Sequence, residues 1–370
     1  MSTVHDVAIL GATPAGFAAA CLLAKARRDV VVIDTPPSAT ACPLADWTTA
    51  DFFRLPGLPA GLVGKAKARP FGTVCYHSVR LDRQVPHRRS GVVGYFLQPA
   101  DLTAVLAAAA RKAGAKARTS VTVPIIRQME DRICACGSTE VEARVLIVVD
   151  GHPHDVLGDL GLADRTVRPA PLIVAGVDVP VAHRGDGALH IVEEPERSEI
   201  GMFFTLDGRL HMRVISNSPA AGMRSAELSA LVARMQQTGL LPAKLPLHRA
   251  RGAVWRPPGG LALELETHVS KRCVLAGTAG GFVEPVAGQA LYTAVASALL
   301  AAQATLKALD SQDVCEALMA YRTSWRKQLE KRLLRPGTPF QVLLPLVFAN
   351  PKVAGRLTST LLFGQQGVRG

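Results

Sequence analysis

The opening of the chain constrains its fold more than any other feature. Residues 5–11 (HDVAILG) are an apolar run, residues 14–27 are rich in alanine and leucine, and residues 29–34 (DVVVID) are apolar again until Asp34. A short run that is apolar at successive positions is typical of a parallel strand buried on both faces. The two runs and the segment between them therefore predict a β-α-β unit of about 30 residues in an α/β protein.

The turn after the first predicted strand has two of the three glycines of a dinucleotide-binding turn. In such a turn the first glycine makes the tight bend, the second lets the backbone approach a diphosphate, and the third lets the helix pack against the strand. Gly11 and Gly16 occupy the first and third positions, whereas Thr13 occupies the second. The turn therefore predicts a phosphate site that has a β-branched side chain where the ligand would approach.

The residues around this turn also suit a nucleotide. Pro14 and Ala15 would begin the helix, whose N-terminal N–H groups and dipole attract phosphate. Asp34 ends the second strand, the position from which a carboxylate reaches a ribose hydroxyl. Two interpretations follow. Either the site is occupied and the Thr13 hydroxyl bonds a phosphate, or a protein that binds no nucleotide has kept the turn.

The composition indicates a folded globular protein but does not identify its binding partner. The chain has 370 residues, of which 48% are hydrophobic and 19% charged, as expected of a folded protein with a large core. The formal net charge of +12 would suit an anionic membrane surface, an acidic ligand or a polyanion. The sequence contains no recognised nucleic-acid-binding module, so we expect no nucleic acid partner.

Cysteines and histidines give no sign of a metal site in the sequence. The seven cysteines lack zinc-finger and redox spacing, and we expect most of them to be buried thiols in a reducing compartment. His152 and His154 form an H-x-H pair with no further ligand in view, so we expect a surface loop there. The N-terminus runs directly into the first strand and no apolar run reaches about 20 residues, so we expect a cytoplasmic protein.

The rest of the chain reads as strands and helices in a mixed order. Residues 35–93 are irregular and rich in Gly, Pro and Arg, and residues 98–116 read as a helix. Several strands follow up to residue 151, and residues 171–216 alternate as an antiparallel sheet would. A helix near 225–238, a buried strand at RCVLAG and a long helix from about 289 to 309 complete this part. This order predicts a nucleotide-binding domain interrupted by a substrate sheet.

A second glycine-rich segment, RCVLAGTAGGFVEPVAGQALYTAVASALLAA from Arg272, leads into the long helix. With the opening turn, it resembles the flavin-binding signature of the FAD-dependent oxidoreductase superfamily of geranylgeranyl reductases and aromatic hydroxylases (p-hydroxybenzoate hydroxylase-like). The usual string there is close to G-D-A-A-G-F-V-D-P, followed by G-(E/Q)-G. VLIVVDG, which contains Asp150 and Gly151, and GYFLQPAD from Gly94 resemble two further segments of that superfamily.

The resemblance covers nearly the whole chain and implies a Rossmann-like domain with FAD extended across it. It also implies that an antiparallel sheet covers the isoalloxazine and that the helix beginning near residue 288 points its positive end at the flavin's pyrimidine side. The cofactor-binding residues that it implies are Gly11, Thr13, Pro14, Ala15, Gly16, Asp34, Gln98, Asp150, Gly277, Thr278, Gly281, Glu284, Pro285, Gly288, Gln289 and Ala290.

Several positions depart from the superfamily's pattern where the cofactor would be contacted. Besides Thr13, Thr278 replaces an aspartate that meets the ribityl chain, Gln98 an arginine, and Ala290 a glycine near the ring, while Glu284 for aspartate is a milder change. Two or three lost hydrogen bonds would weaken cofactor binding on the order of 100-fold. Tight flavin binding would survive that loss, but weak binding would not.

The order of segments and the resemblance together predict the domain organisation. We expect residues 1–165 and 250–310 to form a discontinuous FAD-binding domain with a parallel sheet, and residues 166–249, with part of 70–100, to form the antiparallel substrate-binding sheet. Residues 311–370 would form a C-terminal helical segment.

The C-terminal segment combines a basic stretch, RTSWRKQLEKRLLR, with an apolar stretch broken by Pro345 and Pro351. A basic amphipathic helix beside apolar sequence can lie on an anionic membrane surface, here the inner face. The alternative is a closing helix that packs over the substrate domain with its basic residues in water.

We therefore expect a flavin-dependent oxidoreductase, of reductase or monooxygenase type, acting on an apolar small molecule that is isoprenoid, quinone-like or aromatic. The tyrosine-tryptophan-phenylalanine-proline motif of the reductases and the W-x-W-x-I-P motif of the tryptophan halogenases are both missing, so neither specific activity carries over. His77 is a candidate proton donor, and a solvated or core histidine is the alternative. A flavin-free protein that keeps the fold to bind a ligand or partner is the competing function.

Overall fold

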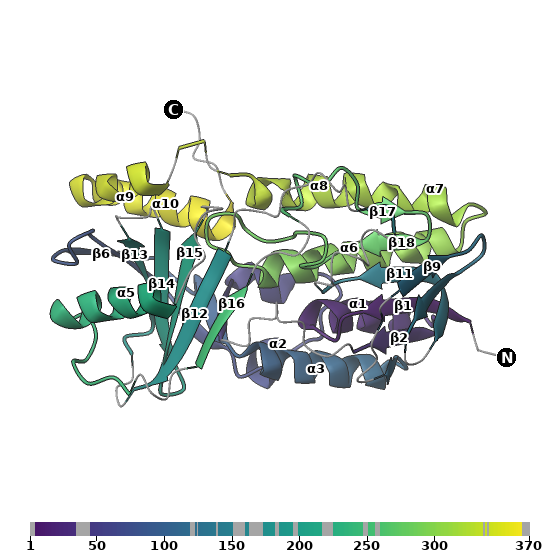
Figure 1. The fold of residues 1–370 in the computed structure, drawn as a ribbon, viewed down its shortest axis with the longest axis horizontal. Coiled ribbons are helices and arrows are strands. Elements are labelled where there is room, and N and C mark those ends of the chain that lie inside the picture. Colours follow the sequence, from purple (N-terminus) through teal and green to yellow (C-terminus); the bar gives the residue numbers. More distant parts are fainter. Residues whose placement is uncertain are drawn as a thin grey trace.

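The computed structural model describes most of the chain. It covers residues 4–34, 45–118, 123, 125–137, 140–150, 160–162, 173–181, 185–194, 199–216, 225–246, 251–255, 260–335, 337–338 and 340–364. Figure 1 shows an elongated molecule with a parallel sheet and its helices at one end and a large antiparallel sheet at the other. The C-terminal helices run along one side of both.

The first sheet is the predicted parallel one. Its strands, in spatial order, are β17 (Val269–Ser270), β18 (Cys273–Leu275), β11 (Val141–Val148), β1 (His5–Leu10), β2 (Val30–Ile33) and β8 (Lys116–Arg118), with β10 (Ile133–Cys136) and β9 (Ile125–Gln128) added beside β11. Strand β1 pairs in parallel with both β11 and β2. The opening β-α-β unit is confirmed, with β1 in the middle of the sheet.

Helices cover one face of this sheet. They are α1 (Pro14–Lys25), α3 (Pro99–Lys112) and α6 (Leu291–Leu309). Alanine-rich α1 and α6 pack closely because small side chains let two backbones approach, and nine of the twelve residues of α1 are buried. Both helices begin at the edge of the sheet where the central parallel strands end, which is where doubly wound folds bind ligands.

The second sheet contains the four strands predicted in residues 171–216 and three more. Its order is β16 (Arg251–Trp255), β12 (Ile173–Pro180), β15 (Arg209–Ser216), β14 (Glu199–Leu206), β13 (Ala188–Glu194), β5 (Thr73–His77) and β6 (Gln84–Arg88). Helix α5 (Ser225–Gln237) covers its outer face (Figure 1). Strands β5 and β6 come from the segment 70–100, and β16 comes from the segment 250–310.

The prediction that residues 35–93 are irregular is wrong for much of their described part. Besides β5 and β6, this region forms β3 (Asp46–Thr49), the short 3-10 helix η1 (Ala50–Arg54), α2 (Leu62–Lys65) and β4 (Arg69–Phe71). β3 and β4 flank β7 (Gly94–Leu97) in a three-stranded sheet between the two larger ones. Strands of three to five residues carry too little periodicity to be recognised in sequence.

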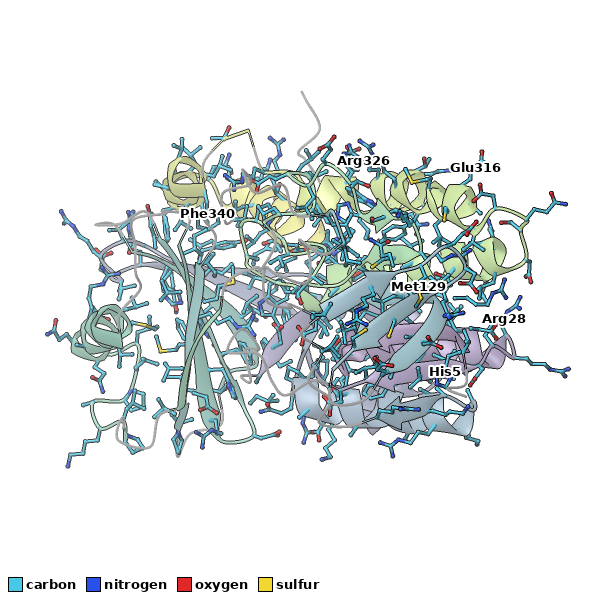
Figure 2. The ribbon with its side chains drawn as sticks, turned by 45° about the vertical axis from the view of Figure 1, so that its right-hand side comes forward. His5, Arg28, Met129, Glu316, Arg326 and Phe340 are labelled. Carbon is cyan, nitrogen blue, oxygen red and sulfur yellow. The ribbon has the colours of Figure 1, made fainter. Side chains whose placement is uncertain are left out.

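The C-terminal segment is helical, as expected, but its parts have different surroundings. Helices α7 (Val314–Leu318) and α8 (Ala320–Leu333) pack on α6, and α8 buries Trp325, Leu329 and Leu333. Helices α9 (Phe340–Ala349) and α10 (Pro351–Phe363) lie over the antiparallel sheet. Figure 2 shows Phe340 above that sheet, with Arg326 and Glu316 over the other end.

Two expectations about this segment are revised. The apolar side of α8 faces the core of the parallel-sheet end, so it is a closing helix there rather than over the antiparallel sheet. Pro345 lies inside α9 instead of breaking it, whereas Pro351 is the first residue of α10, where its missing N–H costs nothing. None of the helices in the described ranges is long and apolar enough to cross a membrane.

Candidate functional site

A cavity of about 270 Å³ lies where the parallel sheet, the three-stranded sheet and the antiparallel sheet meet. Its walls come from segments far apart in the sequence: the start of α1, the end of β11, the start of α3 and the start of α6. The lining residues are Ala12, Thr13, Pro14, Ala15, Asp46, Pro99, Ala100, Thr103, Val149, Asp150, Arg213, Thr278, Gly288, Ala290, Leu291, Ala294 and Val295. The two glycine-rich segments found in the sequence therefore meet at one cavity.

Thr13 is the N-cap of α1. Its φ of −103° and ψ of 172° are ordinary extended values, so this position does not require glycine for its backbone conformation. The Thr13 Oγ1 accepts a hydrogen bond from the Gly16 N–H at 3.4 Å, and Pro14 is the first helical residue. The threonine thus replaces glycine without backbone strain, and its hydroxyl takes the role of a helix cap.

The two remaining glycines of the opening turn are required by close packing. A Cβ on Gly16 would lie 2.0 Å from the Gly11 carbonyl oxygen, and a Cβ on Gly11 would lie 2.8 Å from the Asp150 Cβ. Gly11 also has a φ of +118°. These contacts hold α1 against β1 and β11, as the first and third glycines of the motif should.

The second glycine-rich loop is fixed against the end of β11. The Gly277 N–H donates to the Ser297 hydroxyl of α6 at 3.0 Å, and a Cβ on Gly277 would lie 2.1 Å from the Val149 carbonyl oxygen. The Thr278 hydroxyl donates to the Asp150 carboxylate at 3.2 Å. Thr278 therefore ties the two walls of the cavity together.

Arg213 and Asp46 also line the cavity, and the sequence analysis missed both. The Arg213 Nη1 lies 2.9 Å from the Asp46 Oδ1, and its Nη2 donates to the Ala45 carbonyl oxygen at 2.9 Å. Arg213 lies on β15, where it alternates with buried apolar residues. An arginine on the inward side of a strand is a signal that could have found it, whereas Asp46 follows a stretch with no recognisable pattern.

Several predicted cofactor residues lie behind the cavity wall rather than on it. The Gln289 side chain donates to the Trp47 carbonyl oxygen at 2.9 Å, and Glu284 is buried with its carboxylate 3.7 Å from the Arg332 guanidinium. Burial raises the pKa of Glu284 to about 8, although Arg332 opposes this shift. Gly281 has a φ of +70°, and Pro285 faces a small space beside Arg332.

Asp34 and Gln98 lie on the same side of the parallel sheet's strand ends as the cavity, but neither residue is part of the cavity lining. Asp34 directly follows β2, and its backbone N–H donates to the Arg118 carbonyl oxygen at 2.8 Å. Partial burial raises the pKa of its carboxyl group. Gln98 is the N-cap residue of α3, without a side-chain capping bond. Gly151, His152 and His154 lie outside the described residues.

The cavity residues fit the diphosphate of an extended dinucleotide. The N-terminal turn of α1 and the N-cap residue of α6 both line the space, so two helix dipoles direct their positive ends toward it. Arg213 adds a cation and Thr13 a hydroxyl. Thr13, Thr278 and Ala290 differ from the residues of the flavin-binding signature that the sequence resembles. All three lie on the wall of the cavity, and none of their side chains closes it.

A buried aromatic column joins the three-stranded sheet to the antiparallel sheet. Phe71, Phe96 and Phe204 stack in a column, with ring centroids 4.4 and 4.3 Å apart, and His211 continues it 5.3 Å from Phe204. All four rings are buried. Burial lowers the pKa of His211 to about 4, so the ring is neutral at neutral pH.

His77 lies on the opposite face of the sheet. Val74 and Tyr76 of β5 face the aromatic column, and side chains alternate along a strand, so Cys75 and His77 face α5. The His77 Nε2 is 2.9 Å from the His190 Nδ1, and His77 is only 1% exposed. The structure therefore places His77 in the core, the alternative considered above, and away from the cavity.

Comparisons with known proteins agree with this architecture. No protein-family profile matches the chain. A digeranylgeranylglycerophospholipid reductase of Methanosphaerula palustris is 25% identical over 364 residues, covering 88% of this chain and 82% of the relative. The structure of a geranylgeranyl bacteriochlorophyll reductase-like protein of Thermoplasma acidophilum has a TM-score of 0.75 at 17% identity, over 98% of this chain and 90% of that one.

Two further solved structures broaden the comparison. A p-nitrophenol 4-monooxygenase of Pseudomonas putida has a TM-score of 0.65 at 18% identity, over 98% of this chain and 94% of that one. The flavin-dependent brominase Bmp2 has a TM-score of 0.68 at 14% identity, over 98% and 94%. The resemblance stated from the sequence and the predicted fold class are thereby confirmed.

Proposed function

We propose that this chain, which has the fold of the FAD-dependent oxidoreductases related to geranylgeranyl reductases and aromatic hydroxylases, is itself a flavin-dependent reductase or monooxygenase. The observation that carries the proposal is the meeting of its two glycine-rich segments at one cavity, with the starts of α1 and α6 in the wall. Bound FAD would supply the electron transfer to substrate, which no side chain can perform by itself.

The residues of the chain would bind and orient the cofactor. The first turn of α1, with Thr13, would hold the diphosphate, and the N-terminal end of α6 would lie beside the ring system. Arg213 would place a fixed positive charge on the same side, held by Asp46. A buried guanidinium remains protonated at all relevant pH values, so this charge would be constant.

The nature of the substrate is supported by the lining of the cavity, which is largely apolar. Pro99, Leu291 and Val295 are among the apolar side chains on its wall. Such a wall excludes water and favours an apolar molecule. The relative named for a geranylgeranylated phospholipid supports an isoprenoid substrate within this class.

The absorbance spectrum of the freshly purified full-length protein tests this function. We expect a flavin spectrum, either at once or after incubation with FAD and removal of the excess. A Gly16→Ala variant, in which the new methyl group would meet the Gly11 carbonyl oxygen, should lose that spectrum. A protein that stays colourless with added FAD would overturn the proposal in favour of the flavin-free function.

We also propose that α9 contacts an anionic membrane surface. Val342 and Leu346 lie one turn apart on this helix and are 56% and 47% exposed. The Arg83 guanidinium lies over the Phe348 ring of the same helix, and the chain carries a net charge of +12. Apolar side chains flanked by cations are what an anionic lipid surface attracts.

A further inference from the structure

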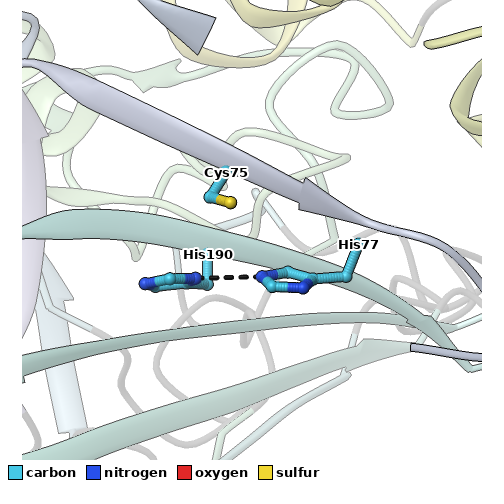
Figure 3. A group of neighbouring side chains, drawn as sticks. All are labelled: Cys75, His77 and His190. Atoms are coloured by element: carbon cyan, nitrogen blue, oxygen red, sulfur yellow. Dashed lines mark hydrogen bonds between the residues drawn. The ribbon is translucent and has the colours of Figure 1, made fainter. Parts of the chain in front are cut away.

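Three potential metal ligands meet on the outer face of the antiparallel sheet. The ligand atoms of Cys75, His77 and His190 all lie within 4.8 Å of one another, and none of the three side chains is exposed. Figure 3 shows the His77 and His190 rings joined edge to edge by their hydrogen bond, with Cys75 beside His190. This cluster is separated from the cavity described above by the thickness of the sheet.

The strand register creates this arrangement, which the sequence could not reveal. Cys75 and His77 are two residues apart on β5, so they share a face. His190 lies directly opposite Cys75 on β13, in a parallel pairing. Three backbone positions in two adjacent, fully paired strands hold the ligands, so the strand pairing fixes their spacing.

An orienting carboxylate completes the cluster. The His190 Nε2 lies 3.0 Å from the Asp186 Oδ1, while its Nδ1 points at His77. The Asp186 Oδ1 also accepts the Ala188 backbone N–H at 3.1 Å, which fixes the carboxylate. A carboxylate on the far nitrogen of a histidine is the usual partner of a metal-ligating imidazole, because it sets the tautomer that leaves the other nitrogen free to ligate.

We propose that Cys75, His77 and His190 bind one borderline-soft divalent metal ion of the Zn²⁺ class. One thiolate and two imidazoles match the ligand preferences of such ions and not those of Mg²⁺ or Ca²⁺. In a tetrahedral site with bonds of about 2.05 Å, two imidazole nitrogens lie roughly 3.4 Å apart. The two nitrogens are 2.9 Å apart in the hydrogen-bonded pair. Small rotations of the two rings that separate these nitrogens by about a further half ångström would therefore admit the ion.

A fourth coordination position would open toward a second cavity. A space of about 220 Å³ adjoins His190 and Asp186 and is walled mainly by apolar residues. The Gln84 Oε1, 3.7 Å from the Cys75 Sγ, also lines this space. Three protein ligands with an open position describe a site that can take a water or a small ligand, rather than a closed structural site. The Cys75 thiol proton would pass to solvent as the metal binds.

A competing cluster gives the test its control. Cys134, Cys136 and Glu140 also bring three ligand atoms together, but Glu140 is exposed and the set contains no histidine. The two sulfur atoms there are 3.0 Å apart on one strand. Nothing like the Asp186 carboxylate orients this second group among its described neighbours.

The experiment is a Co²⁺ titration of the metal-free, full-length protein, followed as a difference spectrum against the same protein without metal. We expect one Co²⁺ per chain, with a thiolate-to-cobalt charge-transfer band and the d–d bands of a tetrahedral site, both displaced by Zn²⁺. Cys75→Ser should abolish the charge-transfer band, whereas the double variant Cys134→Ser, Cys136→Ser should keep it.

A positioning variant separates metal binding from general damage to the fold. Asp186→Asn should weaken Co²⁺ affinity about 10- to 100-fold, while leaving the charge-transfer band at saturation. Asp207→Asn, at an exposed turn of the same sheet, is the matched control and should not change the affinity. Circular dichroism spectra of all variants show whether the sheet has folded.

Two outcomes would overturn the metal site. One is a wild-type protein that gives no charge-transfer band with saturating Co²⁺, which would leave the Asp186–His190–His77 chain as a hydrogen-bond relay. The other is a band that survives in Cys75→Ser and disappears in the double variant, which would assign the metal to the second cluster. Both readouts are independent of whether FAD is bound, so failure of the proposed flavin function would not affect them.

Discussion

The Arg213 guanidinium lies 2.9 Å from the Asp46 carboxylate, joining the antiparallel sheet to the three-stranded sheet at the wall of the main cavity. Both side chains are largely removed from water, with 6% and 15% exposure. The pair also connects the two ends of the molecule. A buried ion pair at such a junction specifies how two layers meet, because either partner alone would leave an unpaired charge.

We therefore expect Arg213→Met to lower the free energy of unfolding by about 3 kcal/mol, since it leaves the Asp46 carboxylate without its cation. The double variant Arg213→Met, Asp46→Asn should lose much less than the sum of the two single losses. Urea denaturation of the three variants measures this coupling. Removal of the exposed Lys67–Asp101 pair is the control and should cost less than about 1 kcal/mol. Equal losses at both pairs would contradict the prediction.

Substitutions of Thr13 provide a second test, because loss of the helix cap changes the free energy of unfolding whereas loss of the side-chain bulk changes the affinity for FAD. Thr13→Ala removes the cap and should lower the free energy of unfolding by about 1 kcal/mol, whereas Thr13→Gly should cost only a few tenths. If the diphosphate approaches this position, Thr13→Gly should also bind FAD about tenfold more tightly, a gain of about 1.4 kcal/mol.

Thr13→Ser and Thr13→Val separate the hydroxyl from the methyl group. The serine keeps the cap and should bind FAD at least as tightly as the natural protein, whereas the valine loses the cap and keeps the bulk. Flavin fluorescence quenching gives the affinities. FAD affinities that are the same for glycine, serine and valine would show that the ligand does not meet residue 13.

Gly277 should tolerate no side chain. Its φ is +57°, and an added Cβ would lie 2.1 Å from the Val149 carbonyl oxygen. Gly239 has a similar φ of +74°, but nothing lies within 4 Å of an added Cβ there. Gly239→Ala should therefore cost only the conformational penalty of about 1 kcal/mol. Gly277→Ala should cost several times as much or prevent folding, and equal melting temperatures for the two variants would refute this.

The parts of the fold that sequence reasoning predicted are those determined by local pattern. The β1–α1–β2 unit follows from two largely apolar strands and an alanine-rich helix with Pro14 at its first position, all within one short segment. In β6, by contrast, the residues QVPHR are alternately exposed and partly buried. That strand exists because it pairs with β5, a tertiary contact that no local pattern shows.

The candidate site likewise contains residues that local sequence identifies and residues that only the tertiary structure brings together. The glycines of both loops were identified because close approach and positive φ restrict those positions to glycine. Arg213 with Asp46, and His190 with Cys75, were not foreseen because each pair joins strands that are distant in sequence. The sequence predicts a break in the apolar stretch at Pro345, yet α9 continues through it. That helix is held by packing of Phe340, Leu344 and Val347 on the antiparallel sheet, which offsets the lost hydrogen bond.

The exposed apolar pair on α9 leads to a prediction about lipid binding. Val342→Glu, Leu346→Glu should reduce sedimentation of the protein with anionic phospholipid vesicles at least about tenfold, by combining lost apolar burial with charge repulsion. Ile125→Glu is the control, since Ile125 is 45% exposed on β9, at the parallel-sheet end of the molecule. Neutral vesicles and high salt should also weaken binding. Binding that is unchanged in the α9 variant would exclude this helix as the contact.

Glu284 should make stability depend on pH in a direction opposite to that of a typical carboxylate. Burial raises its pKa from 4.5 to about 8, so the folded protein holds its proton more tightly than the unfolded chain does. The resulting stabilisation is fully present below pH 4.5 and is lost as the pH rises through about 8. Glu284→Gln, which keeps the shape and cannot ionise, should remove this part of the pH dependence and raise the relative stability above pH 8. Urea midpoints at pH 6 and pH 9 for both proteins measure this difference in pH dependence.

If Arg332 instead keeps the carboxylate ionised, the substitution would destabilise the protein at both pH values, because the buried guanidinium would lose one of its two acidic partners.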